Sequence, residues 1–242
     1  MISFQGVTDL GKCGKKRNHE RGNGTMFTLR LSPKGESLSI LCLGAHSDDI
    51  EIGCGGTILK LMKTYNRTFF HWVVLSSNGK RKREAKESVN ALLADAENKV
   101  VTIKDFKDGF FPYIGDEIKG YFEVLKKEVD PDLIFTHHRA DLHQDHRLVS
   151  ELTWNTFRDH LILEYEIPKY DGDLGAPNVF CHLDKGICRS KAQHILKHFK
   201  TQGENQWFTE ETFRAILRLR GIEANAPAQY AEAFYCRKLI LA

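Results

Sequence analysis

The sequence predicts an α/β fold with a mostly parallel central sheet. From about Ser37 onward, short apolar runs typical of β-strands alternate with longer segments that have the pattern of helices. The apolar runs are continuous rather than alternately apolar and polar, which is typical of strands covered on both faces by crossover helices. The 242 residues also suit one domain of this kind. We therefore expect a Rossmann-like three-layer sandwich.

The first half of the chain supplies the regular part of this sheet. Four candidate strands occur at Ser39–Ala45 (SILCLGA), Thr68–Leu75 (TFFHWVVL), Lys99–Ile103 (KVVTI) and Asp132–Thr136 (DLIFT). Helical patterns follow them at Gly56–Thr64, Arg81–Ala96, Ile118–Val129 and His146–His160. Parallel strands joined in this way place their carboxyl ends at one edge of the sheet, where ligands bind.

The second half is predicted to extend the sheet and add two helices. Further strand signals occur at Leu161–Glu166, Val179–Leu183 and Ala233–Leu241, and helices are expected at Lys191–Phe199 and Glu210–Arg220. No internal repeat or low-complexity block interrupts this part of the chain. We therefore expect a single domain over residues 37–242.

Charge separates the first residues from this domain. Residues 1–25 carry five basic and two acidic side chains, which accounts for the net charge of +3 and leaves the rest neutral. We interpret residues 1–36 as a basic N-terminal extension that is poorly ordered. A neutral domain gives no electrostatic reason to expect nucleic acid as a partner.

The apolar and cysteine patterns bear on localisation. No apolar run reaches the ~20 residues that a membrane span needs, so no integral membrane segment is expected. The N-terminus lacks the apolar core of a signal peptide, and the six cysteines occur singly without a CxxC pair. We expect a cytoplasmic protein with reduced thiols.

Two polar clusters come directly after predicted strands. His46-Ser47-Asp48-Asp49 follows the first strand, and a run from His137 to His146 follows the strand DLIFT. The second run holds four of the eleven histidines of the chain. Because both clusters lie at carboxyl ends of parallel strands, we expect them to meet at one edge of the sheet.

These clusters can supply a metal site. A catalytic zinc ion takes three protein ligands, often histidine and carboxylate, and keeps a fourth position for water. We assign His46, Asp49 and His146 as ligands of Zn²⁺; the same set also suits Fe²⁺. The alternative is that these side chains are helix caps and surface residues.

Three further residues suit hydrolysis at such an ion. Asp48 precedes a ligand and is a candidate general base. His143 is a candidate stabiliser of a developing oxyanion. Asp145 is expected to hydrogen-bond His143, fix its tautomer and raise its pKa; its alternative role is the N-cap of the following helix.

A glycine run, Gly53-Cys54-Gly55-Gly56, comes after the first cluster. It is not the complete GxGxxG fingerprint of dinucleotide-binding proteins, so nucleotide binding remains a weak alternative. We expect the glycines to let the metal loop turn sharply and the helix pack close to the sheet.

At these residues the sequence resembles the LmbE-like, or PIG-L, family of zinc-dependent N-acetylglucosaminyl deacetylases. The family motif AHPDDE followed by GGT stands here as AHSDDIEIGCGGT from Ala45, and its HxDH motif as His143-Gln144-Asp145-His146. The departures are Ser47 in place of proline and Ile50 in place of the final acid, and neither removes a candidate ligand. The resemblance implies the same ligands, base and oxyanion stabiliser as the residue chemistry does.

The resemblance also implies a substrate region. The segment Arg81-Lys82-Arg83-Glu84-Ala85 is similar to a family stretch whose arginine faces the substrate, so Arg81 is a candidate contact; a solvated basic face is the alternative. Residues 106–113 (FKDGFFPY) follow the third strand at the same edge, and Asp108 is a candidate ligand of sugar hydroxyls. A packing role is the alternative for this loop.

The predicted function is therefore removal of an acetyl group from the amide nitrogen of an N-acetylated amino sugar or its conjugate. Two alternatives remain: hydrolysis of another amide or of a phosphoester at the same metal, and a binding protein that holds metal without turnover. The expected partner is a small-molecule amino sugar, and the resemblance also favours a homo-oligomer.

Overall fold

The computed structural model describes residues 28–31 and 37–240. Contacts divide the chain into a unit from Met1 to Arg30, of which only residues 28–30 are described, and a larger unit from Leu31 to Ala242. The expected boundary at residues 36 and 37, and most of the basic extension, lie outside the described residues. The larger unit holds all the helices and strands of the described part of the chain.

At the centre of this unit is a seven-stranded, mostly parallel sheet, as predicted. The strand order is β3-β2-β1-β4-β5-β7-β6. The strands are β1 (Leu38–Gly44), β2 (Thr68–Val74), β3 (Asn98–Ile103), β4 (Leu133–His137), β5 (Leu161–Tyr165), β6 (Val179–Leu183) and β7 (Tyr230–Tyr235). The first five strands are parallel, and β7 is antiparallel to both of its neighbours, β5 and β6.

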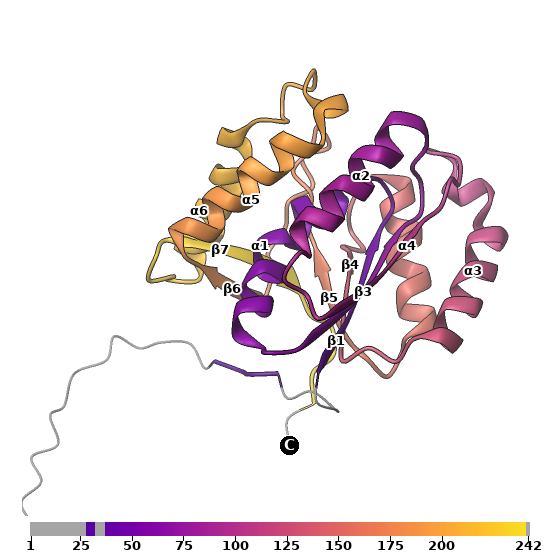
Figure 1. The fold of residues 1–242 in the computed structure, drawn as a ribbon, viewed down its shortest axis with the longest axis horizontal. Helices are drawn as coiled ribbons and strands as arrows, with labels where there is room; N and C mark the ends of the chain where they lie inside the picture. Colours follow the sequence, from indigo (N-terminus) through magenta and orange to yellow (C-terminus); the bar gives the residue numbers. More distant parts are fainter. Residues whose placement is uncertain (1–27, 32–36, 241–242) are drawn as a thin grey trace, which may run out of the picture. The chain divides into compact units, whose positions relative to one another are not determined.

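Helices cover both faces of the sheet and complete the three-layer sandwich (Figure 1). They are α1 (Asp49–Thr64), α2 (Gly79–Leu92), α3 (Gly115–Glu128), α4 (Gln144–Thr156), α5 (Lys185–His198) and α6 (Glu210–Glu223). Short 3₁₀ turns lie at η1 (Phe111–Tyr113) and η2 (Lys200–Gln202). One buried cluster joins the sheet to α1, α2 and α5, and a second joins its other face to α3 and α4.

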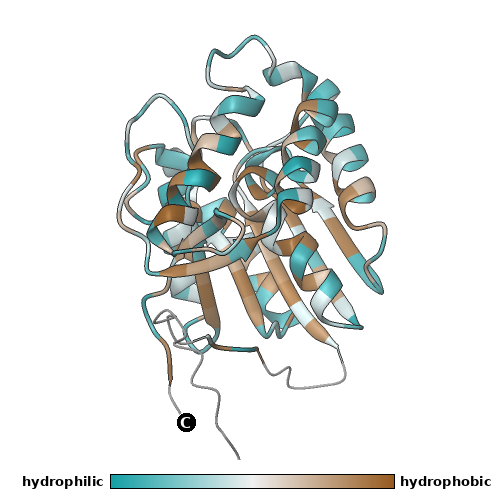
Figure 2. Cartoon of the chain, turned by 90° about the vertical axis from the view of Figure 1, so that its left-hand side faces the viewer, coloured by the Kyte–Doolittle hydropathy of each residue, from teal (hydrophilic) through white to brown (hydrophobic). Residues whose placement is uncertain are grey.

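The strands are apolar on both faces because both are buried. In β1, Leu38, Ile40 and Cys42 belong to the first cluster, and Leu41 and Leu43 belong to the second. Figure 2 shows the result: the strands are largely hydrophobic, and the helices carry hydrophilic residues on the surfaces that they expose. The continuous apolar runs of the sequence are therefore explained by the layering.

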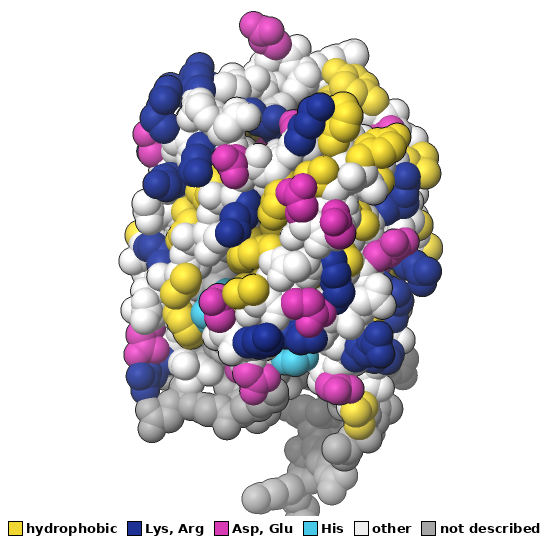
Figure 3. Space-filling view, turned by 90° about the vertical axis from the view of Figure 1, so that its right-hand side faces the viewer, with side chains coloured by type: hydrophobic (Ala, Val, Ile, Leu, Met, Phe, Trp, Pro, Cys, Tyr) yellow, Lys and Arg dark blue, Asp and Glu magenta, His cyan; other side chains and the backbone are white. Residues whose placement is uncertain are grey.

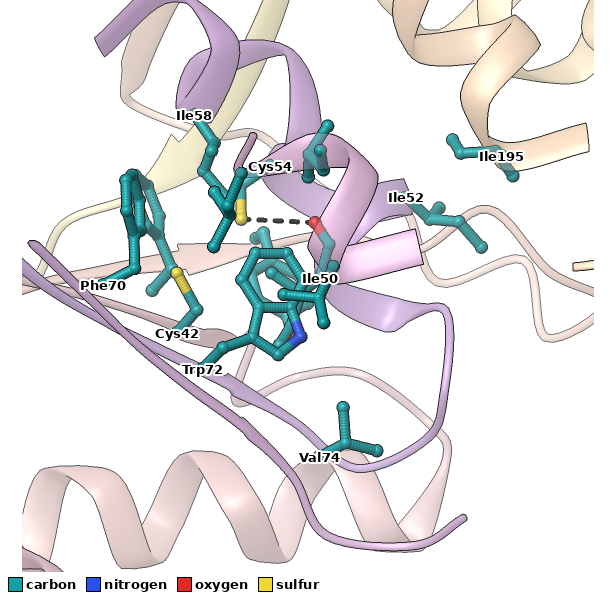
Figure 4. Close-up of a cluster of buried hydrophobic side chains, with 14 of the residues drawn as sticks. Cys42, Ile50, Ile52, Cys54, Ile58, Phe70, Trp72, Val74 and Ile195 are labelled. Atoms are coloured by element: carbon teal, nitrogen blue, oxygen red, sulfur yellow. Dashed lines mark hydrogen bonds between the residues drawn. The ribbon is translucent and has the colours of Figure 1, made fainter. Parts of the chain in front are cut away.

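Helix α1 packs against β1 and β2 through its apolar side chains. Figure 4 shows Ile50, Cys54 and Ile58 of α1 beside Cys42 of β1 and Trp72 of β2. The thiol of Cys54 donates to the carbonyl of Ile50 at 3.3 Å. The cysteines of the described residues are all free, in agreement with the expectation from their spacing.

The start of α1 corrects one sequence prediction. The glycine run was expected to form a turn before a helix at Gly56, but α1 begins seven residues earlier, at Asp49. The glycines lie inside the helix, where a Cβ on Gly53 would lie 2.2 Å from the ring of Tyr165 and one on Gly56 would lie 2.7 Å from Leu183. The glycines therefore allow close packing of the helix, as expected. The expectation that they form a turn in the metal loop is wrong, because they lie inside α1.

Smaller differences affect the second half. Strand β7 ends at Tyr235, whereas the sequence suggested a strand to Leu241, and α5 begins at Lys185 rather than Lys191. Asp184 caps α5 by accepting from the amide of Ile187 at 2.7 Å, so the helix can begin there. Within the described residues, no helix is both long and apolar enough to cross a membrane.

Candidate metal and catalytic centre

The two polar clusters meet at the carboxyl ends of β1 and β4. These strands are parallel neighbours in the sheet. The turn after β1 carries His46 and Asp48 and runs into α1, whose first residue is Asp49. The loop after β4 carries Asp141 and His143 and runs into α4. The convergence expected from strand order is therefore present.

Side-chain atoms of His46, Asp49 and His146 face one another in a buried group. His46 Nδ1 lies 3.2 Å from His146 Nε2, and Asp49 Oδ2 lies 3.5 Å and 3.6 Å from these two nitrogens. All three residues are at most 7% exposed. The structure thus brings together the three residues that the sequence assigned as ligands.

Hydrogen bonds on the far side of each ring orient the two imidazoles. His146 Nδ1 lies 2.9 Å from Asp141 Oδ2, and His46 Nε2 lies 3.0 Å from Asp108 Oδ1 and 3.3 Å from Asp145 Oδ2. A neutral imidazole that donates from one nitrogen presents a lone pair on the other. His46 Nδ1 and His146 Nε2 are 3.2 Å apart, so two lone pairs would face each other beside the Asp49 carboxylate. This arrangement needs a positive charge between the atoms, either a proton or a metal ion.

The neighbouring charges shift the pKa values of His46 and Asp49. Burial opposes the charge of His46, but Asp49, Asp108 and Asp145 raise its pKa well above the ordinary value. Burial also opposes the charge of Asp49, yet the surrounding histidines, chiefly His146, hold its pKa well below the usual range. Asp49 therefore remains an anion, which a cation between the ligands needs.

Asp48 lies in the N-cap position of α1 and is 5% exposed. Burial, followed by the neighbouring charge of Asp49, raises the pKa of Asp48 to about 6. Arg81 and His46 oppose this rise. A carboxylate with this pKa is ionised at neutral pH and is a better proton acceptor than an ordinary aspartate.

The structure corrects the expected relation between His143 and Asp145. The carboxylate of Asp145 accepts from the amides of Gly109 at 2.7 Å and Phe111 at 3.1 Å. The N-cap of α4 is His143, whose Nδ1 accepts from the amide of Asp145 at 3.2 Å. Burial and the charge of His46 lower the pKa of His143, whereas a raised one was expected from the sequence.

Arg81 and Asp108 form an ion pair beside the centre, where Asp108 also contacts His46. Arg81 Nη1 lies 2.9 Å from Asp108 Oδ2, and the side chains are 30% and 49% exposed. A hydrogen bond to His46, stronger than the opposing effect of burial, holds the pKa of Asp108 well below its usual range. Both residues are therefore accessible beside the buried ligands, as a substrate contact must be.

Sequence reasoning missed two buried residues at the centre. His137 ends β4, stacks on His146 with 3.9 Å between ring centroids, and places Nε2 3.2 Å from Asp49 Oδ2. Asp141 contacts His146 Nδ1 and is 3% exposed. Both residues lie in the histidine-rich run from His137 to His146, and this position was the sequence signal for them. In this run, only residues of the HxDH motif were assigned roles from the sequence.

Two other groups of side chains in the described part could in principle hold an ion. One is His137, Asp141 and His146, and the other is His46, His143 and Asp145. Lys169 Nζ lies 3.1 Å from Asp141 in the first group, and backbone amides already occupy Asp145 in the second. Asp49 Oδ2 likewise accepts from the amide of His46 at 2.6 Å, so occupied acceptors do not separate the three groups. The group of His46, Asp49 and His146 is the one that the sequence assigned as ligands.

Figure 3 shows the face of the molecule that carries α3. Over the described residues of this face, basic and acidic side chains are interspersed, and hydrophobic ones lie between them. This pattern differs from the continuous basic surface with which proteins follow a nucleic-acid backbone.

The family model described as GlcNAc-PI de-N-acetylase matches residues 41–157, which include every candidate site residue. Over 148 residues, the chain is 28% identical to the uncharacterized deacetylase YaiS of Escherichia coli K12; the match covers 57% of this chain and 78% of YaiS.

Solved structures share the fold. The N,N'-diacetylchitobiose deacetylase of Pyrococcus horikoshii has a TM-score of 0.61 and 21% identity, over 82% of this chain and 83% of that one. GalB, the 4-carboxy-2-hydroxymuconate hydratase of Pseudomonas putida KT2440, has a TM-score of 0.65 and 18% identity, over 85% and 98% of the two chains. At these identities the likeness establishes the fold alone.

Proposed function

Because the chain belongs to the PIG-L, or LmbE-like, family of deacetylases, we propose that it is a zinc-dependent hydrolase of an N-acetylated amino sugar or its conjugate. The observation that carries this proposal is the convergence of His46, Asp49 and His146 beside a partly exposed pair, Arg81 and Asp108. A deacetylase needs such a buried centre with an accessible side.

His46, Asp49 and His146 would hold the ion. Two imidazole nitrogens and one carboxylate oxygen suit Zn²⁺ and leave a position for water, and Fe²⁺ accepts the same donors. When bound, the ion polarises the acetamide carbonyl and lowers the pKa of its water. The orientation of both imidazoles supports this assignment, because each directs a nitrogen toward Asp49.

Asp48 is the proposed general base. It accepts one proton from the attacking water as the water oxygen bonds to the acetyl carbon. It then returns this proton to the sugar nitrogen as the carbon–nitrogen bond breaks, which gives a free amine and acetic acid, and the acid loses its remaining proton to solvent as acetate. The raised pKa of Asp48, about 6, supports both steps, since the group can gain and lose a proton near neutral pH.

His143 is the proposed oxyanion donor, in its neutral form. Its Nδ1 accepts a hydrogen bond from the amide of Asp145, so the single proton of the neutral ring is on Nε2. A neutral N–H can stabilise the negative charge that develops on the carbonyl oxygen. The proposed role of Asp145 is to fix the adjoining loop through the amides of Gly109 and Phe111.

Arg81 and Asp108 are the proposed substrate contacts. Asp108 can accept from sugar hydroxyls, and Arg81 can donate to hydroxyls or to an anionic group on a conjugate. The amino-sugar class is favoured because the chain matches the GlcNAc-PI de-N-acetylase model across the site.

The test combines metal analysis with amine release. We expect about one zinc per chain and release of amine from N-acetylglucosamine conjugates that stops on chelation and returns with Zn²⁺. Phosphoesters and unrelated amides serve as comparison substrates. Metal without amine release from any N-acetyl sugar would contradict the substrate class, and failure to bind zinc would contradict the ligand assignment.

A further inference from the structure

Asp141, in the loop after β4, contacts both His143 and His146, the two histidines of the HxDH motif. Its Oδ2 lies 2.9 Å from His146 Nδ1, and its Oδ1 accepts from the backbone amide of His143 at 2.8 Å. The same Oδ1 lies 3.1 Å from Lys169 Nζ. Building on the proposed function, we propose that Asp141 is a positioning residue, which Lys169 holds in place and which presents His146 to the metal ion.

The contacts of Asp141 determine the tautomer of His146. Asp141 Oδ1 faces the ammonium group of Lys169 and the backbone amide of His143. Both groups are hydrogen-bond donors, so this oxygen acts only as an acceptor. Oδ2 then accepts a hydrogen bond from the Nδ1–H group of His146. With its proton on Nδ1, the neutral ring directs the lone pair of Nε2 toward His46 and Asp49.

Asp141 also sets the spacing between His143 and His146. Because it holds the amide of His143 and the ring of His146 together, it fixes the relative position of the proposed oxyanion donor and the proposed ligand. Their rings stack with 4.5 Å between centroids. Carboxylates that bind the outer nitrogen of a metal-bound histidine fix its orientation and increase its basicity.

Lys169 supports Asp141 from the segment after β5. Its side chain is 9% exposed and also pairs with Asp173, which in turn accepts from the amide of Leu142 at 2.7 Å. This segment therefore supports the loop after β4 at two points, Asp141 and Leu142. Lys169 also compensates the buried charge of Asp141, which is 3% exposed.

The experiment measures zinc affinity of the full chain by competition with a chelator of known affinity, independently of any sugar substrate. We expect Asp141→Asn and Asp141→Ala to weaken zinc binding about 10- to 100-fold. Lys169→Met keeps the contact between Asp141 and His146, so this variant should lose less zinc affinity than the Asp141 variants. Asp173→Ala is the matched control: it removes one support of the loop but no contact to either histidine, and it should bind zinc like the parent chain.

A second readout separates positioning from general loosening of the loop. In metal-free protein labelled with ¹⁵N in its histidines, the His146 ring should show the Nδ1–H form in the parent chain and in Asp173→Ala, and a mixture of tautomers in Asp141→Ala. Equal zinc affinity in parent and Asp141→Ala would overturn the inference. So would an equal loss in Asp173→Ala, since the loop and not the carboxylate would then be responsible. If the parent binds zinc but releases no amine, the proposed function fails while this test still applies.

Discussion

Lys191 of α5 and Glu232 of β7 form a buried ion pair that holds the middle of α1. Lys191 Nζ lies 2.5 Å from Glu232 Oε1, and both residues are 3% exposed. The carboxylate also accepts from the amides of Gly56 at 2.8 Å and Thr57 at 2.6 Å, while Lys191 donates to the carbonyl of Ile52 at 2.5 Å. The pair thus joins α5 and β7 to α1, the helix that begins at Asp49.

Removal of one member of this pair should leave an uncompensated buried charge. We expect Lys191→Met and Glu232→Gln each to lower the free energy of unfolding by about 3–5 kcal/mol. The double variant should lose less than the sum of the two single variants, because no charge is then left alone. Urea unfolding measures all four proteins, and additive losses would show that the two residues act independently.

Two glycines of α1 offer a matched comparison of packing. A Cβ on Gly53 would lie 2.2 Å from the ring of the fully buried Tyr165, whereas one on Gly55 would meet no atom closer than 3.9 Å. We expect Gly53→Ala to destabilise the protein by about 3 kcal/mol, as overpacking does. Gly55→Ala should be neutral or stabilise by up to about 1 kcal/mol through helix propensity. Thermal and urea unfolding check both, and equal behaviour would contradict the close approach of Tyr165.

His194 should make the stability depend on pH. Burial, followed by the charges of His198 and Lys197, lowers the pKa of His194 to about 4, and its Nε2 lies 2.8 Å from Ser88 Oγ. The folded protein therefore binds this proton more weakly than the unfolded chain does. The stability that His194 contributes is complete above about pH 6.5 and is lost as the pH falls toward 4.

We expect this loss to be about 2 kcal/mol. Unfolding by urea at about pH 7.5 and about pH 4.5 measures it, with His194→Gln as the comparison. The glutamine can still donate to Ser88 but does not titrate, so the variant should lose about 2 kcal/mol less than the parent on acidification. The same loss in both proteins would assign the acid sensitivity to other groups.

Asp48→Asn tests the proposed base separately from the metal. The amide cannot accept the proton from water, so we expect amine release to fall about 10²- to 10⁴-fold. Zinc content should be unchanged, since the converging ligand atoms belong to other residues. Activity close to that of the parent would mean that another group accepts the proton.

Much of the fold could be predicted because its signals are local. Continuous apolar runs mark strands buried on both faces, and strand order then brings His46 and His146 together although they are 100 residues apart. The start of α1 could not be predicted in this way. Glycine favours turns in general, and what requires it inside this helix is the ring of Tyr165, a residue far later in the chain.

The same reason explains the errors within the site. The residue types and spacing of the HxDH motif indicated a metal and its catalytic partners. They did not indicate that the carboxylate of Asp145 would be taken by the amides of Gly109 and Phe111, because that contact depends on the path of a loop after β3. The predicted hydrogen bond between the Asp145 carboxylate and the His143 ring is therefore absent, and it is Asp141, which the motif omits, that contacts the ring of His146.

The bonds from Asp145 to Gly109 and Phe111 have a consequence for which residue of this loop can vary. They hold the main chain on both sides of Phe110 and make no use of its side chain, which is 42% exposed. Position 110 can therefore accept different side chains while the bonds to Asp145 persist. Residue 110 can therefore vary beside the centre without disturbing the main chain that holds Asp145.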